Sequence, residues 1–453
     1  MSVLQMVRDQ EAALVSPASV REEPPQGGLR GTRELMDLKE RLKRELVRRL
    51  GLEVVASMAS SADSTRARGE LSVACQAILR SGDFSTLGPH ERGELEGWVL
   101  DDICGLGPLQ PLLDDDSVTE VMVNGREGLF FEREGRIHPA RAVFDSDEQI
   151  LMVVDRILAP LGRRFDRNCP IVNARLANGD RVNAVSPPIA IDGPMVTIRK
   201  FSNRISTLGR LVELGSLPDW YAQLLSWAVR LRQDVAVAGG TGSGKTTLLN
   251  ALSCEIPPSE RIVTIEDSAE LKFDSHPNVV RLEARTASIE GSGEISIRDL
   301  VKNALRMRPD RIVVGEVRGE EAIDMLQAMN TGHDGSLTTL HAGTAQEAVL
   351  RLVLMARFGM DLPTDIIEEQ IATALDFLVM SQRLPDGRRV IASLNAVTRE
   401  GSGGVRLEEA VRFDEASRCW SLGFEPAFVG RGLEEGVLDE GEVALWRRRM
   451  SLA

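Results

Sequence analysis

A glycine-rich loop between an apolar strand and a helical segment constrains the fold of this chain most. Residues 234–253 read DVAVAGGTGSGKTTLLNALS, and in them Gly239, Gly244, Lys245 and Thr246 have the spacing of a P-loop. Glycines let successive backbone N–H groups converge on phosphate oxygens, and the N-terminus of the following helix adds partial positive charge. The segment therefore predicts an α/β domain that binds a nucleotide.

The P-loop pattern also assigns individual contacts. We expect Lys245 to reach the β- and γ-phosphates and Thr246 to be a ligand of Mg²⁺. The predicted nucleotide-binding residues are Gly239, Gly240, Thr241, Gly242, Ser243, Gly244, Lys245, Thr246 and Thr247.

Two further apolar segments lead into acidic residues. RIVTIEDSAEL (261–271) reaches Glu266, and RIVVGEVRG (311–319) reaches Glu316. Ligands of doubly wound sheets bind at the carboxyl ends of the strands, so both acids can face one γ-phosphate. One carboxylate would order the Mg²⁺ shell through water, and the other would orient the attacking water. The alternative is that both are ordinary charged strand ends.

The segment TGHDGSLTTLHAGTA (331–345) contributes two histidines, His333 and His341. Their separation of eight residues is not the i, i+4 pair of a helical zinc site. Beside a P-loop, the functional interpretation is a sensor of the γ-phosphate. The alternative for each histidine is a buried polar group whose hydrogen bonds are satisfied within the fold.

The N-terminal part of the chain changes pattern twice. Residues 1–30 contain SPASVREEPPQGG, which has no apolar periodicity and is typical of a disordered tail. Apolar residues at positions 35, 38, 42, 46 and 50 indicate one face of a helix, and further helical patterns extend this small module over 31–104.

Strand and turn patterns then predict an α+β domain over 105–204. Within it VNARLANGDRVNAV (172–185) reads as a hairpin with a two-residue Asn-Gly turn. The P-loop domain is expected over 205–385, and residues 386–453 are expected to form a separate β/helical tail.

Charge and composition exclude several classes of protein. With 54 Lys and Arg against 68 Asp and Glu, the net charge is −14, which argues against stable binding to nucleic acid. Five cysteines without a CxxC pair suggest neither a disulfide framework nor a zinc site. The N-terminus lacks the apolar core of a signal peptide, and no segment has the ~18 uncharged apolar residues of a membrane span. We therefore expect a cytoplasmic protein whose membrane contact is peripheral.

The P-loop, TIED, VGEVRG and TGHDGSLTTLH, in this order, resemble the ATPases of type II and type IV secretion and of type IV pili. In that superfamily TIED belongs to an "Asp box", VGEVRG to a Walker B motif that ends in Glu, and TGHDGSLTTLH to a "His box". The resemblance covers about residues 31–400. ICGLGPLQPLL (103–113), VTEVMVNG (118–125) and DGPMVTIRKF (192–201) are similar to the Tad/Flp pilus assembly ATPases of the CpaF type. The tetracysteine insertion of type IVa pilus extension ATPases is missing, which fits that subgroup.

The resemblance implies a RecA-like P-loop ATPase domain preceded by an α+β domain and a small helical module. It implies a homo-hexamer that hydrolyses ATP with Mg²⁺ and turns hydrolysis into domain motion. That motion would drive assembly, and in some relatives retraction, of a Tad/Flp-type pilus. The implied partners are platform proteins of the inner membrane, and the implied location is the cytoplasmic face of that membrane.

The resemblance also assigns catalytic roles. Glu316 would be the magnesium-side acid, Glu266 the general base, and His341, with His333, the sensor. Family arginines that complete the site match Arg181 and Arg199. Arg175 is a further candidate, but a two-residue turn would point it and Arg181 to opposite faces of the hairpin, because side chains alternate along a strand. Both could serve one phosphate only if the turn is longer or bulged.

Three other functions are compatible with parts of this pattern. The nearest is a type IV secretion traffic ATPase that moves protein or DNA substrates. A RecA-like nucleic-acid translocase is a second, against which the acidic composition and the single Tyr argue. A nucleotide-switched scaffold without turnover is a third, against which the complete catalytic set argues.

Overall fold

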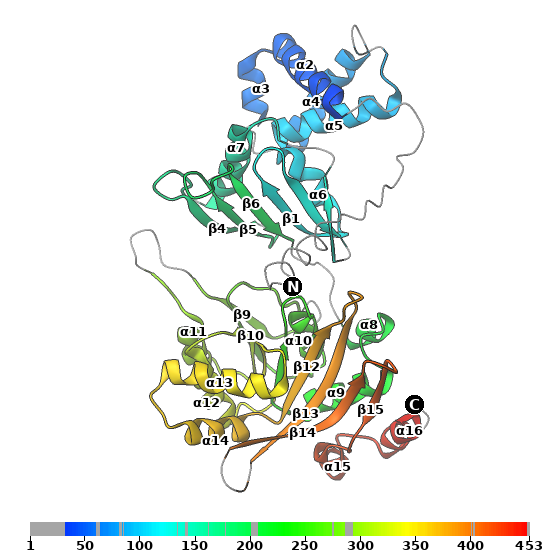
Figure 1. Cartoon of the computed structure of the whole chain (residues 1–453), viewed down its shortest axis with the longest axis vertical. Coiled ribbons are helices and arrows are strands. Elements are labelled where there is room, and N and C mark those ends of the chain that lie inside the picture. The colour runs from blue at the N-terminus through cyan, green and yellow to red at the C-terminus, as the bar shows by residue number, and fades with distance from the viewer. Residues whose placement is uncertain are drawn as a thin grey trace, which may run out of the picture. The chain divides into compact units, whose positions relative to one another are not determined.

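The computed structural model describes residues 32–59, 64–80, 84, 86–133, 135–140, 144–161, 163–176, 178–200, 207–273, 276–285, 293–399, 401 and 404–450. The tail predicted at 1–30 lies outside these residues. The chain divides into two compact units (Figure 1). The first comprises Met1–Ala174 and Val182–Arg199, and the second comprises Arg175–Arg181 and Lys200–Ala453.

The first unit combines a helical layer with a six-stranded sheet. Its helices are α2 (Thr32–Leu50), α3 (Leu52–Ala59), α4 (Ser64–Leu79), α5 (Pro89–Cys104), α6 (Gln110–Asp114) and α7 (Asp147–Leu158), with the 3₁₀ turns η2 (Gly107–Leu109) and η3 (Ala159–Leu161). Its strands are β1 (Val118–Asn124), β2 (Leu129–Arg133), β3 (Arg136–Pro139), β4 (Ile171–Arg175), β5 (Arg181–Val185) and β6 (Met195–Arg199). They are ordered β3-β2-β1-β6-β5-β4.

The helical module predicted at 31–104 belongs to the same unit as the α+β domain. Its apolar face is buried as expected, since Leu42 and Leu46 are fully enclosed. A buried ion cluster crosses the predicted boundary. Lys39 Nζ lies 3.1 Å from Asp102 and 2.8 Å from Asp145, and Lys39 is only 2% exposed. A buried lysine without these carboxylates would be strongly destabilising, so the two segments are tied together.

The β4–β5 hairpin differs from its predicted register. The Leu176 N–H donates to the Asp180 carbonyl at 2.9 Å, and the Ser186 N–H donates to the Pro170 carbonyl at 2.8 Å. Three residues, not two, therefore separate the pair that closes the turn. This register sets Arg175 directly opposite Arg181, on the same face of the hairpin. The expected two-residue turn is wrong, and the longer turn, which was the alternative, brings the two arginines to one face.

The second unit is built on a nine-stranded sheet. Its helices are α8 (Leu208–Glu213), α9 (Asp219–Arg230), α10 (Lys245–Ser253), α11 (Ile297–Ala304), α12 (Glu321–Asn330), α13 (Ala345–Gly359), α14 (Thr364–Ala374), α15 (Ala427–Glu434) and α16 (Glu440–Met450). Its strands are β7 (Val235–Gly239), β8 (Ile262–Glu266), β9 (Val279–Glu283), β10 (Arg311–Val317), β11 (Leu337–His341), β12 (Phe377–Arg383), β13 (Arg389–Arg399), β14 (Val405–Asp414) and β15 (Cys419–Leu422).

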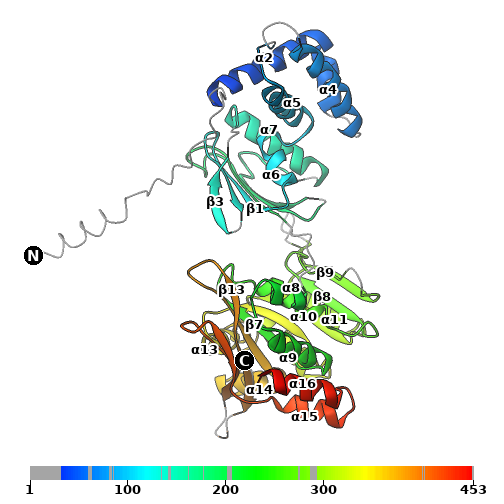
Figure 2. The same cartoon turned by 90° about the vertical axis from the view of Figure 1, so that its right-hand side faces the viewer.

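These strands are ordered β15-β14-β13-β12-β7-β11-β10-β8-β9. The pairs from β12 to β9 are parallel, and those from β12 to β15 are antiparallel. Helices α12, α13 and α14 cover one face of the sheet, and α9, α10 and α16 cover the other (Figures 1 and 2). Because both faces are covered, β7 alternates between two cores: Val237 belongs to one and Ala238 to the other. The α/β, RecA-like fold predicted for this part is confirmed.

The C-terminal segment is part of this domain and not a separate tail. The boundary predicted at 385/386 falls in the turn between β12 and β13, two strands that pair along their length. Trp446 of α16 is fully buried against Trp227 of α9, with ring centroids 5.3 Å apart. Its Nε1 donates to the Trp220 carbonyl at 2.7 Å. Consecutive hairpin strands attached to β12, together with the distant contact between α16 and α9, extend the domain to residue 450.

A buried arginine organises the amino edge of the parallel strands. Arg311 is fully buried and pairs with Glu260. Its guanidinium also donates to the Gly335 carbonyl at 2.9 Å and to the Val229 carbonyl at 2.8 Å. Gly335 has φ +83°, and a Cβ there would lie 1.7 Å from the arginine Nη1. Glycine at 335 is therefore required by both backbone and packing.

Because of this contact, we expect alanine to destabilise the protein more at Gly335 than at Gly332 of the same motif. Gly335→Ala should lower the free energy of unfolding by about 3 kcal/mol or more, because Arg311 must move from a fully satisfied buried position. Gly332→Ala is the matched control: it shares a positive φ of +92° but has open space around it, so it should cost about 1 kcal/mol. Urea unfolding followed by tryptophan fluorescence measures this, since four of the five tryptophans lie in the second unit. Equal losses in the two variants would contradict the packing argument.

Candidate nucleotide-binding site

The predicted P-loop has the strand–loop–helix context that phosphate binding requires. It leaves β7 at Gly239 and enters α10 at Lys245. Gly242 (φ +71°) and Gly244 (φ +100°) adopt a left-handed backbone that favours glycine. A Cβ on Gly239 would lie 2.3 Å from the Ser381 carbonyl and 2.4 Å from Ser243 Oγ. These glycines let the loop curl tightly at the N-terminus of α10.

Three polar residues follow the loop in the first turn of α10: Lys245, Thr246 and Thr247. Lys245 Nζ donates to the Gly240 carbonyl at 3.1 Å, which holds the ammonium group across the loop. Thr246 is half-buried in the first turn of α10, and Thr247 beside it is exposed. Backbone N–H groups at a helix N-terminus and a lysine ammonium are the donors that bind polyphosphate. The residues present therefore fit a nucleoside triphosphate.

Parallel register brings the other predicted residues to the same edge. His341, the last residue of β11, pairs with Gly239, the last residue of β7. Val317 at the end of β10 pairs with Leu340. Thr339 Oγ1 donates to the Gly315 carbonyl at 2.7 Å, which ties β11 to β10 beside Glu316. The P-loop, both acids and His341 therefore lie along one carboxyl edge.

Glu266 is enclosed and oriented by the backbone that follows it. It is 2% exposed, and its Oε2 accepts the N–H groups of Glu270 at 2.6 Å and Leu271 at 2.9 Å. Burial raises the pKa of this carboxyl, while the two N–H groups oppose that rise. Its Cγ lies 3.1 Å from the point where a Cβ on Gly315 would sit, so glycine there makes room for it.

Glu316 is more accessible than Glu266 and has an arginine partner. The register of β10 against β11 shifts between Val314 and Val317, and such irregularities redirect side chains. Arg318 donates to Glu316 Oε2 from Nη2 at 2.6 Å and from Nε at 2.9 Å. The same guanidinium lies 3.5 Å from Asp267, next to Glu266. Arg318 thus links the two acidic strand ends.

Sequence reasoning missed Arg318, although a signal was available. Arg318 stands two residues after Glu316, and residues i and i+2 of an extended segment project on the same side. The VGEVRG motif therefore carries an acid and its counter-ion together. The link from Arg318 to Asp267 required the neighbouring strand and could not be inferred from this spacing.

The two histidines occupy opposite ends of β11. His341 lies at the site, but His333 precedes the strand, at its amino end. His333 Nδ1 lies 3.2 Å from the Ala328 carbonyl, near the end of α12, and its own carbonyl accepts from Ser336 Oγ at 2.7 Å. His341 is the last of the five residues of β11, which rises about 3.3 Å per residue, and His333 lies before the first of them. The structure does not bring His333 to the carboxyl edge, and His341 alone is placed for a sensor.

The predicted arginines are distributed over both units. Residues 175–181 belong to the second unit, where Arg181 pairs with Glu270 at 2.9 Å and donates to the Ser268 carbonyl at 3.1 Å. In the same unit Arg175 pairs with Glu283. Arg199 is an exposed residue at the end of β6 in the first unit, opposite Glu120 of β1. Its part in the site stays a prediction.

Only two protein groups, Thr246 and Glu316, are predicted to hold Mg²⁺. Among the described residues there is no group of three or more His, Cys, Asp or Glu side chains that could hold a metal ion. Mg²⁺ is usually bound through one or two protein groups together with substrate phosphates and water. The Thr246 hydroxyl and the Glu316 carboxylate are of that chemistry and lie at the same edge.

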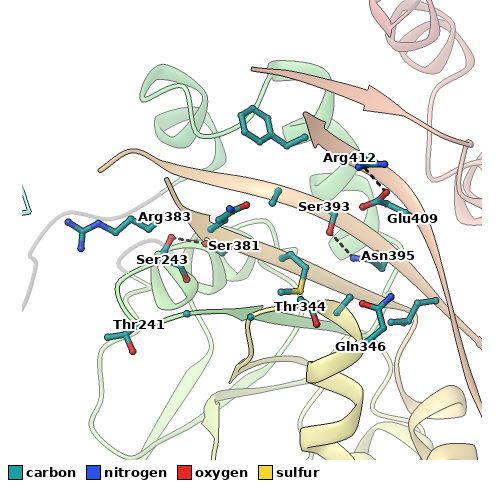
Figure 3. Close-up of a pocket in the computed structure, with 18 residues that line it drawn as sticks. Thr241, Ser243, Thr344, Gln346, Ser381, Arg383, Ser393, Asn395, Glu409 and Arg412 are labelled. Carbon is teal, nitrogen blue, oxygen red and sulfur yellow. Dashed lines mark hydrogen bonds and ion pairs between the residues drawn. The ribbon is translucent and has the colours of Figure 1, made fainter. Parts of the chain in front are cut away.

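A cavity of about 600 Å³ adjoins the P-loop on the side of β12–β14 (Figure 3). Thr241 and Ser243 of the loop, Thr344 and Gln346 at the start of α13, and polar residues of the three strands line it. Figure 3 shows the hydrogen bond between Ser381 of β12 and Ser243 of the loop, both of which line the cavity.

Comparisons with known proteins identify the family of this chain. The family model described as "Type II/IV secretion system protein" matches residues 102–408. A Mycobacterium tuberculosis protein named for a proposed part in conjugal transfer is 37% identical over 311 residues, 67% of this chain and 88% of the relative. The type IV secretion system protein PtlH of Bordetella pertussis is 36% identical over 310 residues, 61% of this chain and 89% of the relative.

Among solved structures, the chain is similar to the VirB11 ATPase of the Brucella suis type IV secretion system. The two sequences are 32% identical, with a TM-score of 0.35, over 63% of this chain and 94% of that one. No helix among the described residues is both long and apolar enough to cross a membrane.

Because the two acids have different surroundings, we expect their substitutions to change the Mg²⁺ dependence of hydrolysis differently. Glu266→Gln and Glu316→Gln should both bind nucleotide and hydrolyse it at least about 100-fold more slowly, because each loses a charge with little change of shape. Glu316→Gln should also need more Mg²⁺ for half-maximal activity, whereas Glu266→Gln should not. Magnesium titrations of steady-state rates test this division. Superimposable titrations would show that the two roles are assigned wrongly.

Proposed function

The chain belongs to the type II/IV secretion system protein family, and we propose that it hydrolyses ATP to drive a secretion or pilus-assembly machine. One observation carries this proposal. A single sheet edge carries a P-loop, two acidic strand ends and a histidine. These are the groups needed to bind a triphosphate, neutralise its charge and orient water.

Each group then has a defined task. Lys245 and the N-terminus of α10 bind the β- and γ-phosphates and neutralise charge as the phosphoryl bond breaks. Thr246 and Glu316 would hold Mg²⁺, the glutamate through water, and the bound ion would supply positive charge to the phosphates. Glu266, whose burial raises its pKa, orients and deprotonates the attacking water. His341 donates a hydrogen bond that depends on the γ-phosphate.

Glu266 must be uncovered for that task. In the structure its carboxylate accepts two backbone N–H groups from the segment that follows β8. Arg318, between Glu316 and Asp267, links that segment to β10. Binding of a triphosphate would compete for this arginine, and its release would free the segment and expose Glu266. Activation of the base would thereby depend on the substrate.

We further propose the machine to be a Tad/Flp-type pilus and the active form to be a homo-hexamer at inner-membrane platform proteins. The motifs at 103–113, 118–125 and 192–201 support this subgroup. Arg199 would bring positive charge from the first unit to the γ-phosphate, where it would join Arg181 of the second unit. Domain closure would then depend on the nucleotide, which is how hydrolysis becomes movement.

A type IV secretion traffic ATPase is the second candidate. The relatives reported above are named for conjugal transfer or for type IV secretion, and this observation favours it. Affinity purification of the full chain from its native membrane distinguishes the two. Recovery of pilus platform subunits supports the first candidate, and recovery of a conjugation or secretion channel supports the second.

ATP hydrolysis itself is tested at the P-loop lysine. Lys245→Ala should fall to about 1% of the parental rate or less, because contacts to the transferring phosphoryl group are lost. Lys302→Ala is a matched control: this lysine is half-exposed on α11 and pairs with Asp324. It should retain the parental rate. Parental turnover in Lys245→Ala, measured by phosphate release, would remove the basis of the proposed function.

Coupling to motion is tested at Arg199. Arg199→Ala should bind ADP normally and keep its oligomeric size, but it should lose about 10³-fold in turnover together with ATP-dependent closure. Arg126→Ala, an exposed arginine of the same unit that pairs with Glu127, serves as the control. A distance probe between the units reports closure. ATP-driven closure that persists in Arg199→Ala would exclude this residue as the coupling group.

A further inference from the structure

We propose that the β12–β13 hairpin is a brace that sets the shape of the P-loop, with Ser381 of β12 and Arg389 of β13 as positioning residues for ATP binding. This inference rests on the proposed function, since it concerns the same nucleotide. Neither residue belongs to the loop, and Arg389 opens the C-terminal strands that sequence analysis assigned to a separate tail.

Two hydrogen bonds define the brace. Arg389 Nε donates to the Gly242 carbonyl at 2.8 Å, and Ser381 Oγ donates to the Ser243 carbonyl at 2.7 Å. These are consecutive carbonyls at the top of the loop. Ser381 also approaches the loop through its backbone, because its carbonyl fills the space where Gly239 would carry a Cβ.

The orientation of these carbonyls fixes the orientation of the donors that bind phosphate. In a planar trans peptide the C=O and the N–H point in opposite directions. Holding the carbonyls of Gly242 and Ser243 toward β12 and β13 therefore turns the N–H groups of Ser243 and Gly244 toward the inside of the loop. There the Ser243 N–H already faces the Gly240 carbonyl, at 3.4 Å. A loop so arranged needs little reorganisation when phosphate binds.

Hydrogen bonds are needed to hold the P-loop in shape, because few side chains pack against the side of the loop that faces β12–β14. The cavity of about 600 Å³ beside the loop is bounded by Gly240, Thr241 and Ser243 on one side and by β12–β14 on the other (Figure 3). Side chains do not fill that space, so they cannot hold the outer part of the loop. Two glycines with left-handed backbone make the loop intrinsically flexible. The brace supplies the restraint that close packing supplies elsewhere.

The brace also brings positive charge close to the phosphate site. Besides Arg389, the Nη1 of Arg383 lies 3.6 Å from the point where a Cβ on Gly242 would sit. Both arginines are exposed, so salt screens their charge. We therefore expect the hydrogen bond from Arg389 to contribute more to ATP affinity than the positive charge of the two arginines does.

The experiment compares two neighbouring arginines in the full-length protein. Arg388 is the matched control, because it is exposed in the turn of the same hairpin and pairs with Asp386 and not with the loop. Arg389→Ala and Ser381→Ala should each raise the dissociation constant of a fluorescent ATP analogue about tenfold, the loss expected for one hydrogen bond to this loop. Arg388→Ala should match the parent. The melting temperature and kcat at saturating ATP should change little in Arg389→Ala.

The affinities, the kinetic constants and the melting temperatures together decide whether the brace positions the loop. A higher dissociation constant and KM in Arg389→Ala, with kcat and melting temperature retained, supports the brace. Affinity equal to that of Arg388→Ala overturns it, and so does a lowered melting temperature with unchanged affinity, which marks a purely structural contact. The binding assay needs no turnover. A parent chain that binds the analogue without hydrolysing ATP would count against the proposed function, while the affinities would still decide the brace.

Discussion

Parallel pairing of β7, β11, β10 and β8 is the constraint on which the candidate site depends. Parallel strands in register end at one edge, so residues separated by many positions in the sequence become neighbours. His341 reaches Gly239 in this way, and the Gly315–Glu316 pair comes beside Glu266. The helices on both faces bury the strands, and burial fixes the register that places these groups.

The two edges of the same strands serve different purposes. At the amino edge Arg311 is fully buried and satisfied by Glu260 and by backbone carbonyls, which makes a rigid corner. At the carboxyl edge Glu316 and Asp267 pair with Arg318, an exposed arginine that a polyanion could also bind. The motif at 331–341 spans both: its glycine at 335 shapes the corner, and His341 reaches the site. The motif at 331–341 therefore contains one residue that is required for packing, Gly335, and one that lies at the candidate site, His341.

The C-terminal strands connect the site to the rest of its domain. β12 pairs with the P-loop strand on the side away from the acids, and β13 to β15 extend the sheet from there. Helix α16 then returns to α9 through Trp446 and Trp227. The P-loop is therefore in contact with an element that ends far from it in the sequence.

The sequence by itself determined the local features of this protein. The P-loop at 239–246, the strands that reach Glu266 and Glu316, and the α/β class follow from short patterns, because spacing and apolar runs encode helix, strand and glycine turn directly. The tertiary structure decided what depends on partners distant in the chain. It joined the helical module to the α+β domain through Lys39, set Arg175 opposite Arg181, placed His333 at the far edge, and made residues 386–450 part of the sheet. Strand register and buried ion pairs are set by contacts between segments, and a single sequence carries no periodic signal for them.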